Sequence, residues 1–420
     1  MKRFVKTTGL LCLLLATLAG VSCTRKQQEA EKKAEPAPAA APAAASACTL
    51  PTTMAATNEQ TAWQLFVAAS CPSNGQLTWE TWTEQTCLAQ PDSPGCAPSA
   101  AAGAAPVRHL HASQLELRRK KTPQAEAAVA APGGCGAMTT LANAPKELLP
   151  FVPKNLSSGA KFCEEVFVDP TEAAFVKAPA SGATLTKLTG QVAYAASAGN
   201  ITFPTSSVEI KADWLPASSV KDAFNCTNPP EGLYVENISG ECYALVGVHV
   251  SSKLLPNWLW ATFEPQNTTT NPNRCSPDLY NSCSDPWGSN PAASTGANTE
   301  PTAALTALMT QANLPKALLN YRLVAAQSAY VTANNAPIQL GNSFVEFNAQ
   351  VLPHQASCIT CHSYAMVSTK AKENPNFGAF PGTPSIGTPG QAPPPSGGGT
   401  WVSQDFSWML GIMPANPPKK

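Results

Sequence analysis

The stretch that decides the fold is Tyr243–Val250, which reads YALVGVHV, followed after a short gap by Trp258–Phe263, which reads WLWATF. Both runs are rich in β-branched and aromatic residues, and turn-forming residues separate them. His249 alternates with valines in the first run, so we expect its side chain on the opposite face of the strand from those valines. The two runs therefore predict strands of an antiparallel sheet.

Three runs upstream, Gln191–Ala195, Ile201–Phe203 and Val208–Ala212, have a similar composition and are bounded by Asn, Gly, Pro and Ser. We expect them to be strands of the same sheet. Short helices are expected at Thr61–Ala69, which has an apolar face, and at 301–313. The predicted fold class is therefore α+β, with a mainly antiparallel β body.

The overall composition excludes some classes of partner. The chain has 420 residues, enough for one large domain or two ordinary ones, and its formal net charge is zero with 13% charged residues. That balance predicts neither a nucleic-acid-binding surface nor a polybasic membrane surface. The 40 prolines predict long loops and short helices.

The first residues have the composition of an export signal. Residues 1–22 combine early positive charge with an apolar core that is too short to span a bilayer. The stretch LAGVSC, ending at Cys23, resembles a bacterial lipoprotein signal, although Gly20 stands where leucine is usual. The resemblance implies a lipidated Cys23 and anchoring in the periplasm or at the outer membrane of a Gram-negative bacterium; the alternative is a plain secretory signal. Residues 23–50 would then form an Ala/Pro-rich tether.

Behind the tether we expect a β-rich body at 51–335, interrupted by a low-complexity insertion at 89–135. The insertion contains the basic patch Arg118–Lys121, which we interpret as a solvated loop. His109 and His111 in the same insertion resemble a chelating pair, but low-complexity sequence makes a metal role the weaker interpretation. The last segment, 336–420, carries the principal motif.

The cysteines predict disulfide bonds. Of the 14 cysteines, Cys12 lies in the signal, Cys23 is the lipidation candidate, and Cys358 and Cys361 belong to the principal motif. An even number remains, which in an exported chain favours disulfides. Two local pairs flank turn-forming residues, so we expect the bonds Cys226–Cys242 and Cys275–Cys283. The pairing of the other six stays open; they are Cys48, Cys71, Cys87, Cys96, Cys135 and Cys163.

The principal motif is Cys358-Ile-Thr-Cys361-His362, a C-x-x-C-H sequence. In an expected helix from Cys358 to Val367, the two thiols lie one turn apart and can each bond to a haem vinyl group, with the imidazole as axial iron ligand. A zinc site would need further close ligands, a thioredoxin-type site would need a βαβ setting, and a disulfide at this spacing would be strained. The motif therefore predicts one covalent haem c.

A second axial ligand is expected downstream, at Met413 in Gly-Ile-Met-Pro. The C-terminal segment here resembles the class I cytochromes c, whose distal methionine often lies in such a loop well after C-x-x-C-H. The alternative for Met413 is an apolar packing residue. The other candidate ligands, each weaker, are Met409, Met366, His354 and His249. We also expect helical structure at Leu340–Leu352.

A wider resemblance joins the two halves of the mature chain. Pro256–Glu264, together with the spaced residues from Leu340 to Cys358, is similar to a group of bacterial cytochrome c family proteins. The resemblance implies that the β body and the haem segment belong together, and it implies no substrate. The leading hypothesis is an electron carrier that meets a redox partner protein. The alternative is a haem c enzyme, peroxidase-like or acting on another small molecule, whose β body forms the substrate pocket.

Overall fold

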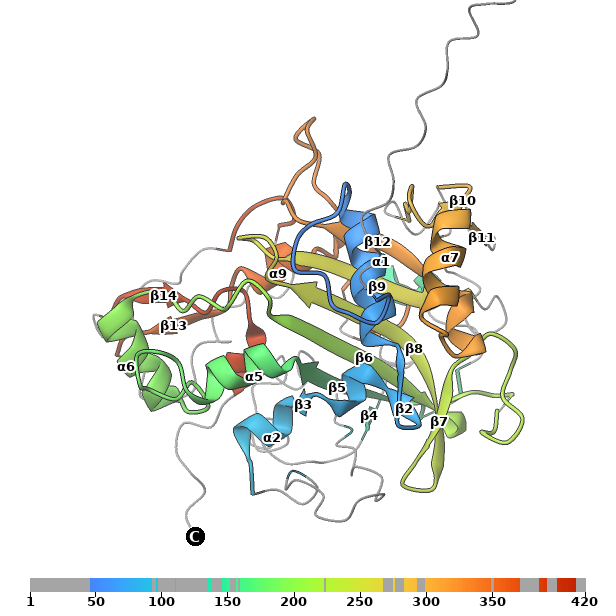
Figure 1. Cartoon of the computed structure of the whole chain (residues 1–420), viewed down its shortest axis with the longest axis horizontal. Coiled ribbons are helices and arrows are strands. Elements are labelled where there is room, and N and C mark those ends of the chain that lie inside the picture. The colour runs from blue at the N-terminus through green and yellow to red at the C-terminus, as the bar shows by residue number, and fades with distance from the viewer. Residues whose placement is uncertain are drawn as a thin grey trace, which may run out of the picture. The chain divides into compact units, whose positions relative to one another are not determined.

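The main feature of the fold is a twisted antiparallel sheet (Figure 1). The computed structural model describes residues 46–92, 96, 110, 135–137, 146–151, 156–157, 159–222, 224–266, 275, 283–292, 299–348, 351–370, 385–390 and 399–412. Residues from Ser46 onward belong to one compact unit. The expected signal at 1–22, the expected tether up to residue 45 and most of the 89–135 insertion lie outside the described residues, whereas residues 46–50, the end of the expected tether, are part of the compact unit.

The large sheet has eight strands, ordered β12-β9-β8-β6-β5-β3, with β4 beside β5 and β7 beside β8. Each of these pairings is antiparallel. Its strands are β3 (Thr83–Glu84), β4 (Gly136–Ala137), β5 (Lys161–Val168), β6 (Val208–Pro216), β7 (Val235–Ile238), β8 (Glu241–Ser252), β9 (Leu259–Pro265) and β12 (Tyr321–Gln327). Small two-stranded ladders pair β1 (Pro72–Ser73) with β2 (Gln76–Leu77), β10 (Ser289–Asn290) with β11 (Glu300–Pro301), and β13 (Met366–Ser368) with β14 (Trp401–Ser403).

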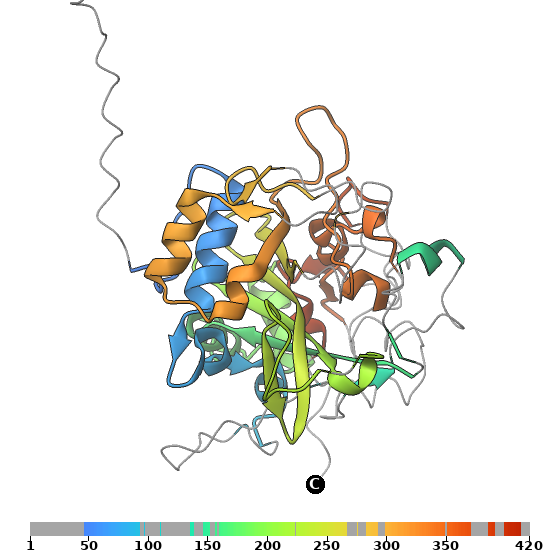
Figure 2. The same ribbon diagram turned by 90° about the vertical axis from the view of Figure 1, so that its right-hand side faces the viewer.

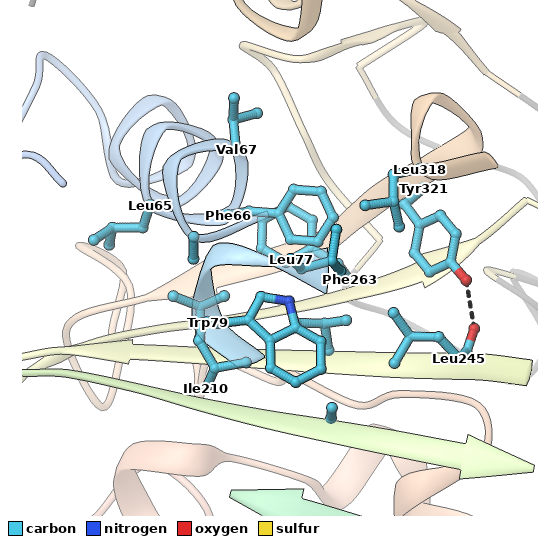
Figure 3. Close-up of a cluster of buried hydrophobic side chains, with 14 of the residues drawn as sticks. Leu65, Phe66, Val67, Leu77, Trp79, Ile210, Leu245, Phe263, Leu318 and Tyr321 are labelled. Carbon is cyan, nitrogen blue, oxygen red and sulfur yellow. Dashed lines mark hydrogen bonds between the residues drawn. The ribbon is translucent and has the colours of Figure 1, made fainter. Parts of the chain in front are cut away.

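One face of the sheet packs on apolar helices. Helix α1 (Asn58–Ala69) begins at Thr57, whose side chain accepts a hydrogen bond from Gln60 N, and α7 (Ala303–Gln311) begins at Thr302 in the same way, with Leu305 N as donor. Phe66 of α1 stacks on Phe263 of β9, with ring centroids 4.3 Å apart. Figure 3 shows this core, including the hydrogen bond from the Tyr321 hydroxyl to the Leu245 carbonyl.

The opposite face of the sheet packs on the C-terminal part of the chain. Figure 2 shows α1 and α7 on one side of the sheet and the orange-to-red segment on the other. That segment contains α8 (Val345–Asn348), α9 (Cys358–His362) and the β13–β14 ladder. The other α-helices within the described residues are α2 (Gln85–Ala89), α5 (Pro170–Lys177) and α6 (Leu188–Ala198). Because the C-terminal segment covers this face, many polar side chains on it are buried.

The strand predictions are confirmed for the runs at 208–212, 243–250 and 258–263, which lie in or overlap β6, β8 and β9. The strand prediction at Gln191–Ala195 is wrong, because this run lies within α6. The helix buries Leu188, Gln191 and Ala195, a helical spacing, and its four alanines favour a helix over the β preference of Val192 and Tyr194. The run at Ile201–Phe203 is also not a strand, although Ile201 and Phe203 are buried.

The helix predictions are confirmed at α1 and α7 and are too long near the C-terminus. The expected helix from Cys358 ends at His362, and Met366–Ser368 instead forms strand β13 against β14. Of Leu340–Leu352, only Val345–Asn348 is an α-helix among the described residues. After His362 the chain leaves the helical conformation because the backbone groups of β13 are satisfied by pairing with β14. Before Val345 the chain is not helical because its backbone groups are satisfied by contacts to the sheet, such as the bond from Ser343 N to Glu264.

Both predicted disulfides are confirmed, Cys226–Cys242 and Cys275–Cys283. The six cysteines left open pair as Cys48–Cys71, Cys87–Cys96 and Cys135–Cys163. All ten cysteines that the sequence assigned to disulfides are therefore bonded. No helix within the described residues is long and apolar enough to cross a membrane.

Asp285 is a buried connection between α1 and the loop before β10, and we expect its loss to destabilise the fold. Its carboxylate accepts hydrogen bonds from Trp63 Nε1 at 2.8 Å, Gly288 N at 2.8 Å and the Ser289 hydroxyl at 3.0 Å. Asp285→Ala leaves three buried donors unsatisfied, which should lower the free energy of unfolding by about 3 kcal/mol or more. Urea unfolding measures this change. Ser289→Ala, which removes a single bond, is the control and should cost about 1 kcal/mol; equal losses for the two variants would contradict the prediction.

Candidate functional site

The C-x-x-C-H motif lies on a short helix held against the sheet. Helix α9 buries Ile359 and Thr360, while Cys358, Cys361 and His362 are only partly buried. The last three are spaced i, i+3 and i+4, so they lie on one side of the helix. Two thiols and one imidazole therefore share the partly exposed side of α9.

Gln327, the last residue of β12, holds the start of α9 in place. Its side-chain amide donates to the Ser357 hydroxyl at 3.0 Å, and its side-chain oxygen accepts from Ile359 N at 3.4 Å. Ile359 packs in an apolar cluster that includes Trp258, Trp260, Leu340 and Met409. Helix α9 is therefore held on the sheet by the packing of Ile359 and by hydrogen bonds to the side-chain amide of Gln327.

His362 is oriented by contacts from two distant parts of the chain, strand β9 and the segment at 406–408. Its Nδ1 lies 2.8 Å from the backbone oxygen of Phe406. The imidazole packs against Trp260 of β9 with ring centroids 4.4 Å apart, and Trp408 approaches edge-on at 6.4 Å. Burial lowers the pKa of His362 to about 4, so the ring is neutral near pH 7. A neutral imidazole whose Nδ1–H donates to a carbonyl presents Nε2 as its basic nitrogen.

The Phe406 carbonyl reaches His362 because of an unusual turn. Asp405 and Phe406 have positive φ angles of 53° and 68°, a conformation uncommon for residues other than glycine. Asp405 is held at both carboxylate oxygens, by Lys253 Nζ at 2.6 Å and by Phe203 N at 2.7 Å. The buried Ser407 hydroxyl also donates to Glu209 at 2.7 Å. These contacts hold the left-handed turn that directs the carbonyl toward the imidazole.

The two cysteines of the motif stand apart from the other described cysteines. Neither Cys358 nor Cys361 forms a disulfide, whereas every other cysteine within the described residues does. Burial raises the pKa of the Cys358 thiol well above its usual value, and the nearby Glu346 raises it further. The thiol therefore stays protonated at neutral pH. The disulfide alternative for this motif receives no support from the geometry.

A group of ionisable side chains occupies the sheet face near α9. We call it the sheet-face cluster; its members are Glu164 of β5, Lys211 and Asp213 of β6, His249 of β8 and Glu346 of α8. Lys211 Nζ lies 2.9 Å from a Glu164 oxygen and 3.7 Å from Asp213 Oδ1, and His249 Nε2 lies 3.7 Å from Asp213 Oδ2. The expected position of His249 is confirmed, because Val248 and Val250 belong to the apolar core on the other face.

The segment before α9 closes over this cluster with a capped turn. Asn342 Oδ1 accepts hydrogen bonds from Phe344 N and Val345 N, and its Nδ2 donates to Thr262 of β9 at 3.2 Å. Glu264, also on β9, accepts from Ser343 N at 3.0 Å. The turn therefore brings Glu346 near Lys211 and Asp213 of β6. Burial raises the pKa of Glu346 to about 8 and Lys211 opposes this rise, while Glu346 in turn adds to the raised pKa of Asp213.

The other predicted site residues fall into three groups. Met413, Cys23, His109 and His111 lie outside the described residues. Met409 is buried in the apolar cluster beside Ile359, and Met366 starts strand β13. His354 lies in a single 3₁₀ turn, Pro353–Gln355, before α9. Within the described part of the chain, no group of three or more His, Cys, Asp or Glu side chains is arranged to hold a metal ion by itself.

Three parts of this site could not be anticipated from the motif: Trp260, the Phe406 carbonyl, and the Asp405–Lys253 pair that supports it. Trp260 has a partial signal, since it lies in a predicted strand and aromatic side chains on a strand often cover a binding group. A backbone carbonyl leaves no signature in the residue types. Asp405 and Lys253 are separated by 152 residues, so their ion pair follows only from the tertiary structure.

Comparisons with known proteins give no relative from which to transfer a function: no family model matches the chain, and neither a curated protein nor a solved structure does. The case for a function therefore depends on the motif and the geometry around it.

Proposed function

We propose that this protein is an exported c-type cytochrome, with one haem attached through Cys358 and Cys361 and with His362 as an axial iron ligand. The observation that carries the proposal is the arrangement on α9. Two thiols and a neutral imidazole share one side of the helix, and a backbone carbonyl at 2.8 Å engages Nδ1. This donor set fits haem c, because iron binds Nε2 of a histidine whose other nitrogen is hydrogen-bonded.

Each residue around the motif has a role in this proposal. The thiols form the covalent link, and the Phe406 carbonyl orients the imidazole and increases its basicity. Trp260 and Trp408 cover the imidazole and limit the access of water. The haem would supply one-electron oxidation and reduction. An exported carrier of this kind would exchange electrons with a redox partner protein in the periplasm or at the cell surface.

The alternative is a haem c enzyme, peroxidase-like or acting on another small molecule. The sheet-face cluster favours it, because buried ionisable groups with shifted pKa values are frequent at catalytic sites. The identity of the second axial ligand separates the two functions. A protein ligand such as Met413 would occupy the second axial position of the iron and suit electron transfer, whereas an open axial position would allow a small molecule to bind.

A pyridine haemochrome spectrum of the denatured protein tests the proposal. Covalent haem c should remain with the polypeptide after acid–acetone extraction and give the α band of a haem with two thioether bonds. Spectra of the native protein in both oxidation states, with and without carbon monoxide, then separate carrier from enzyme. Colour that leaves with the acid–acetone extract would disprove covalent attachment.

Lipid anchoring through Cys23 is a separate prediction. Expressed in a Gram-negative host, the wild-type protein should fractionate with membranes and carry the mass of an acylated N-terminal cysteine. Cys23→Ala should be soluble or remain unprocessed, because the modified thiol is lost. Ser22→Ala, which keeps the cysteine, is the control and should remain in the membrane fraction. A wild-type protein that is wholly soluble and lacks the acyl mass would show that residues 1–22 are a plain secretory signal.

A further inference from the structure

Glu172 is a buried carboxyl group on the first turn of α5. Its side chain is fully buried, and no backbone N–H, amide or hydroxyl group among the described residues donates a hydrogen bond to either of its oxygens. It stands three residues after Asp169, which caps α5, and a glutamate at this position ordinarily accepts a hydrogen bond from the backbone N–H of the cap. Here the Asp169 N–H donates to the Val208 carbonyl of β6 instead, at 3.0 Å. The carboxyl group of Glu172 therefore takes no part in capping its own helix.

The same contacts place Glu172 beside a second carboxyl group, that of Glu209 on β6. Asp169 Oδ1 accepts hydrogen bonds from Val208 N at 3.0 Å and from Glu172 N at 3.1 Å, so the start of α5 is fixed to β6 one residue before Glu209. A hydrogen bond joins the side chains of Glu172 and Glu209, with Glu172 as the donor. Two carboxyl groups can form such a bond only when one of them carries a proton.

Glu209 also holds the turn at Asp405–Ser407. Its Oε1 accepts a hydrogen bond from the hydroxyl of Ser407 at 2.7 Å, and Ser407 is buried. Asp405, at the start of the turn, pairs with Lys253 Nζ at 2.6 Å and accepts a hydrogen bond from Phe203 N at 2.7 Å. The turn is therefore fastened at both ends, by an ion pair at Asp405 and by the pair of carboxyl groups at Ser407.

Of the four carboxyl groups gathered here, Glu172 is the one that lacks a compensating partner among the described residues. The Asp169 carboxylate faces the N–H groups that begin α5, and the Asp405 carboxylate faces the ammonium group of Lys253. Glu209 accepts a hydroxyl hydrogen bond. A buried carboxylate without a donor is costly, so Glu172 is the member of the group that favours its protonated form.

The surrounding charges act in the same direction. The charged side chains on the elements around Glu172 are Asp169 before α5, Glu209 and Lys211 of β6, Lys253 after β8, and Asp405 of the turn. Lys211 is paired with Glu164, and α2, which packs against α5, contains no charged residue. Burial raises the pKa of Glu172 well above its usual value, and Glu209, Asp169 and Asp405 raise it further.

We propose that Glu172 and Glu209 share one proton, and that this acid pair latches the Asp405–Ser407 turn onto α5 and β6. While the proton is present, the pair has a single negative charge, and the Ser407 hydroxyl bonds to it. When the proton leaves to solvent, two buried carboxylates face each other and the turn opens. Because the Phe406 carbonyl belongs to this turn, opening would withdraw the hydrogen-bond acceptor of His362. The latch needs no haem, so it stands or fails independently of the proposed cytochrome.

Proton linkage fixes the direction of the pH dependence. In the open turn Glu172 meets solvent and ionises near its usual pKa of 4.5, whereas in the closed turn it keeps its proton to higher pH. Opening therefore releases one proton in this range of pH. The opening constant should rise by up to about tenfold for each pH unit above 4.5, until the closed form ionises as well. The closed turn is thus most stable in acid and is weakened as the pH rises.

The test is hydrogen exchange of the full mature chain between about pH 5 and about pH 8, followed by mass spectrometry of peptides that cover 399–412. After correction for the intrinsic exchange rate, wild-type protection of the turn should fall with pH by up to about tenfold per pH unit. Glu172→Gln, whose amide can donate to Glu209 but cannot ionise, should remove this pH dependence. Ser407→Ala breaks the bond between the turn and the pair, so opening at about pH 5 should increase on the order of tenfold.

The matched control is Glu84→Gln. Glu84 is also a buried carboxyl group, and burial raises its pKa to about 8. It pairs with Phe167 of β5, whereas Glu209 pairs with Val168, the next residue of that strand, so the two glutamates lie on opposite faces of the sheet. The Glu84 variant should therefore keep the wild-type exchange of the turn at each pH.

Three results would overturn the inference: wild-type protection that does not change with pH, an unchanged slope in Glu172→Gln, or unchanged protection in Ser407→Ala. Calcium ions that slow exchange in the wild type but not in Glu172→Gln would also overturn it, because the pair would then bind a cation rather than a proton. Should Glu172→Gln not fold, Glu209→Gln places the amide donor on the other side of the pair and gives the same comparison.

Discussion

Replacing Cys358 and Cys361 together with alanine is expected to reduce covalent haem from one per chain to none. The reason is chemical, since each thioether bond needs a thiol, and every other cysteine of the described chain is committed to a disulfide. Haem staining of the denatured protein and a pyridine haemochrome spectrum measure the loss. Each single variant should retain one thioether bond and show an α band displaced to longer wavelength, because one vinyl group stays conjugated with the ring.

The matched control for this prediction removes two cysteines elsewhere. The Cys87→Ala, Cys96→Ala variant deletes a disulfide that closes a loop with a sequence separation of 9. It should lose roughly 2–3 kcal/mol of stability by the loop-entropy argument and keep its full haem content. If this control also lost its haem, attachment would depend on the stability of the fold, and the double variant at the motif would no longer identify the attachment site.

Met413→Ala is expected to change the electronic properties of the iron more than any other single substitution outside the motif. A thioether ligand stabilises ferrous iron and gives the ferric protein a weak charge-transfer band at long wavelength. The variant should lose that band, bind carbon monoxide readily and fall in potential by on the order of 0.1 V, a fraction of the roughly 0.8 V range set by axial ligands. Redox titration and carbon monoxide difference spectra measure these changes.

Met409→Leu is the control for Met413. Met409 is buried at 3% exposure in the apolar cluster beside Ile359, so a leucine of similar volume should leave the band and the potential near their wild-type values. His249→Gln tests one of the weaker candidate ligands in the same assay. Should the wild-type protein itself bind carbon monoxide and lack the band, the carrier hypothesis would lose its main support. The haem enzyme would then be the better explanation.

The strands that could be predicted are those with one apolar and one polar face in the sequence. In β8, the alternation around His249 identifies both the strand and the direction of each side chain. Strand β5, with Glu164 and Glu165 in its middle, and strand β12, which contains Arg322, lack this pattern and were not predicted. Glu164 and Arg322 are buried because the C-terminal segment and other loops cover a sheet face that is usually in contact with water. Glu165 is buried on the opposite face, where it accepts a hydrogen bond from Trp214 Nε1.

The sequence by itself determined the chemistry of the motif, because C-x-x-C-H places its three functional groups within little more than one helical turn, and a local spacing fixes a local geometry. It also determined the two short-range disulfides, since each closes a small loop over turn-forming residues. Only the tertiary structure decided what surrounds His362: the carbonyl of Phe406, the ring of Trp260 and the nearby Asp213–His249 pair. These groups come from separate strands and from a left-handed turn held by an ion pair between distant residues. No local pattern encodes such contacts, because they depend on how the completed sheet and the C-terminal segment pack together.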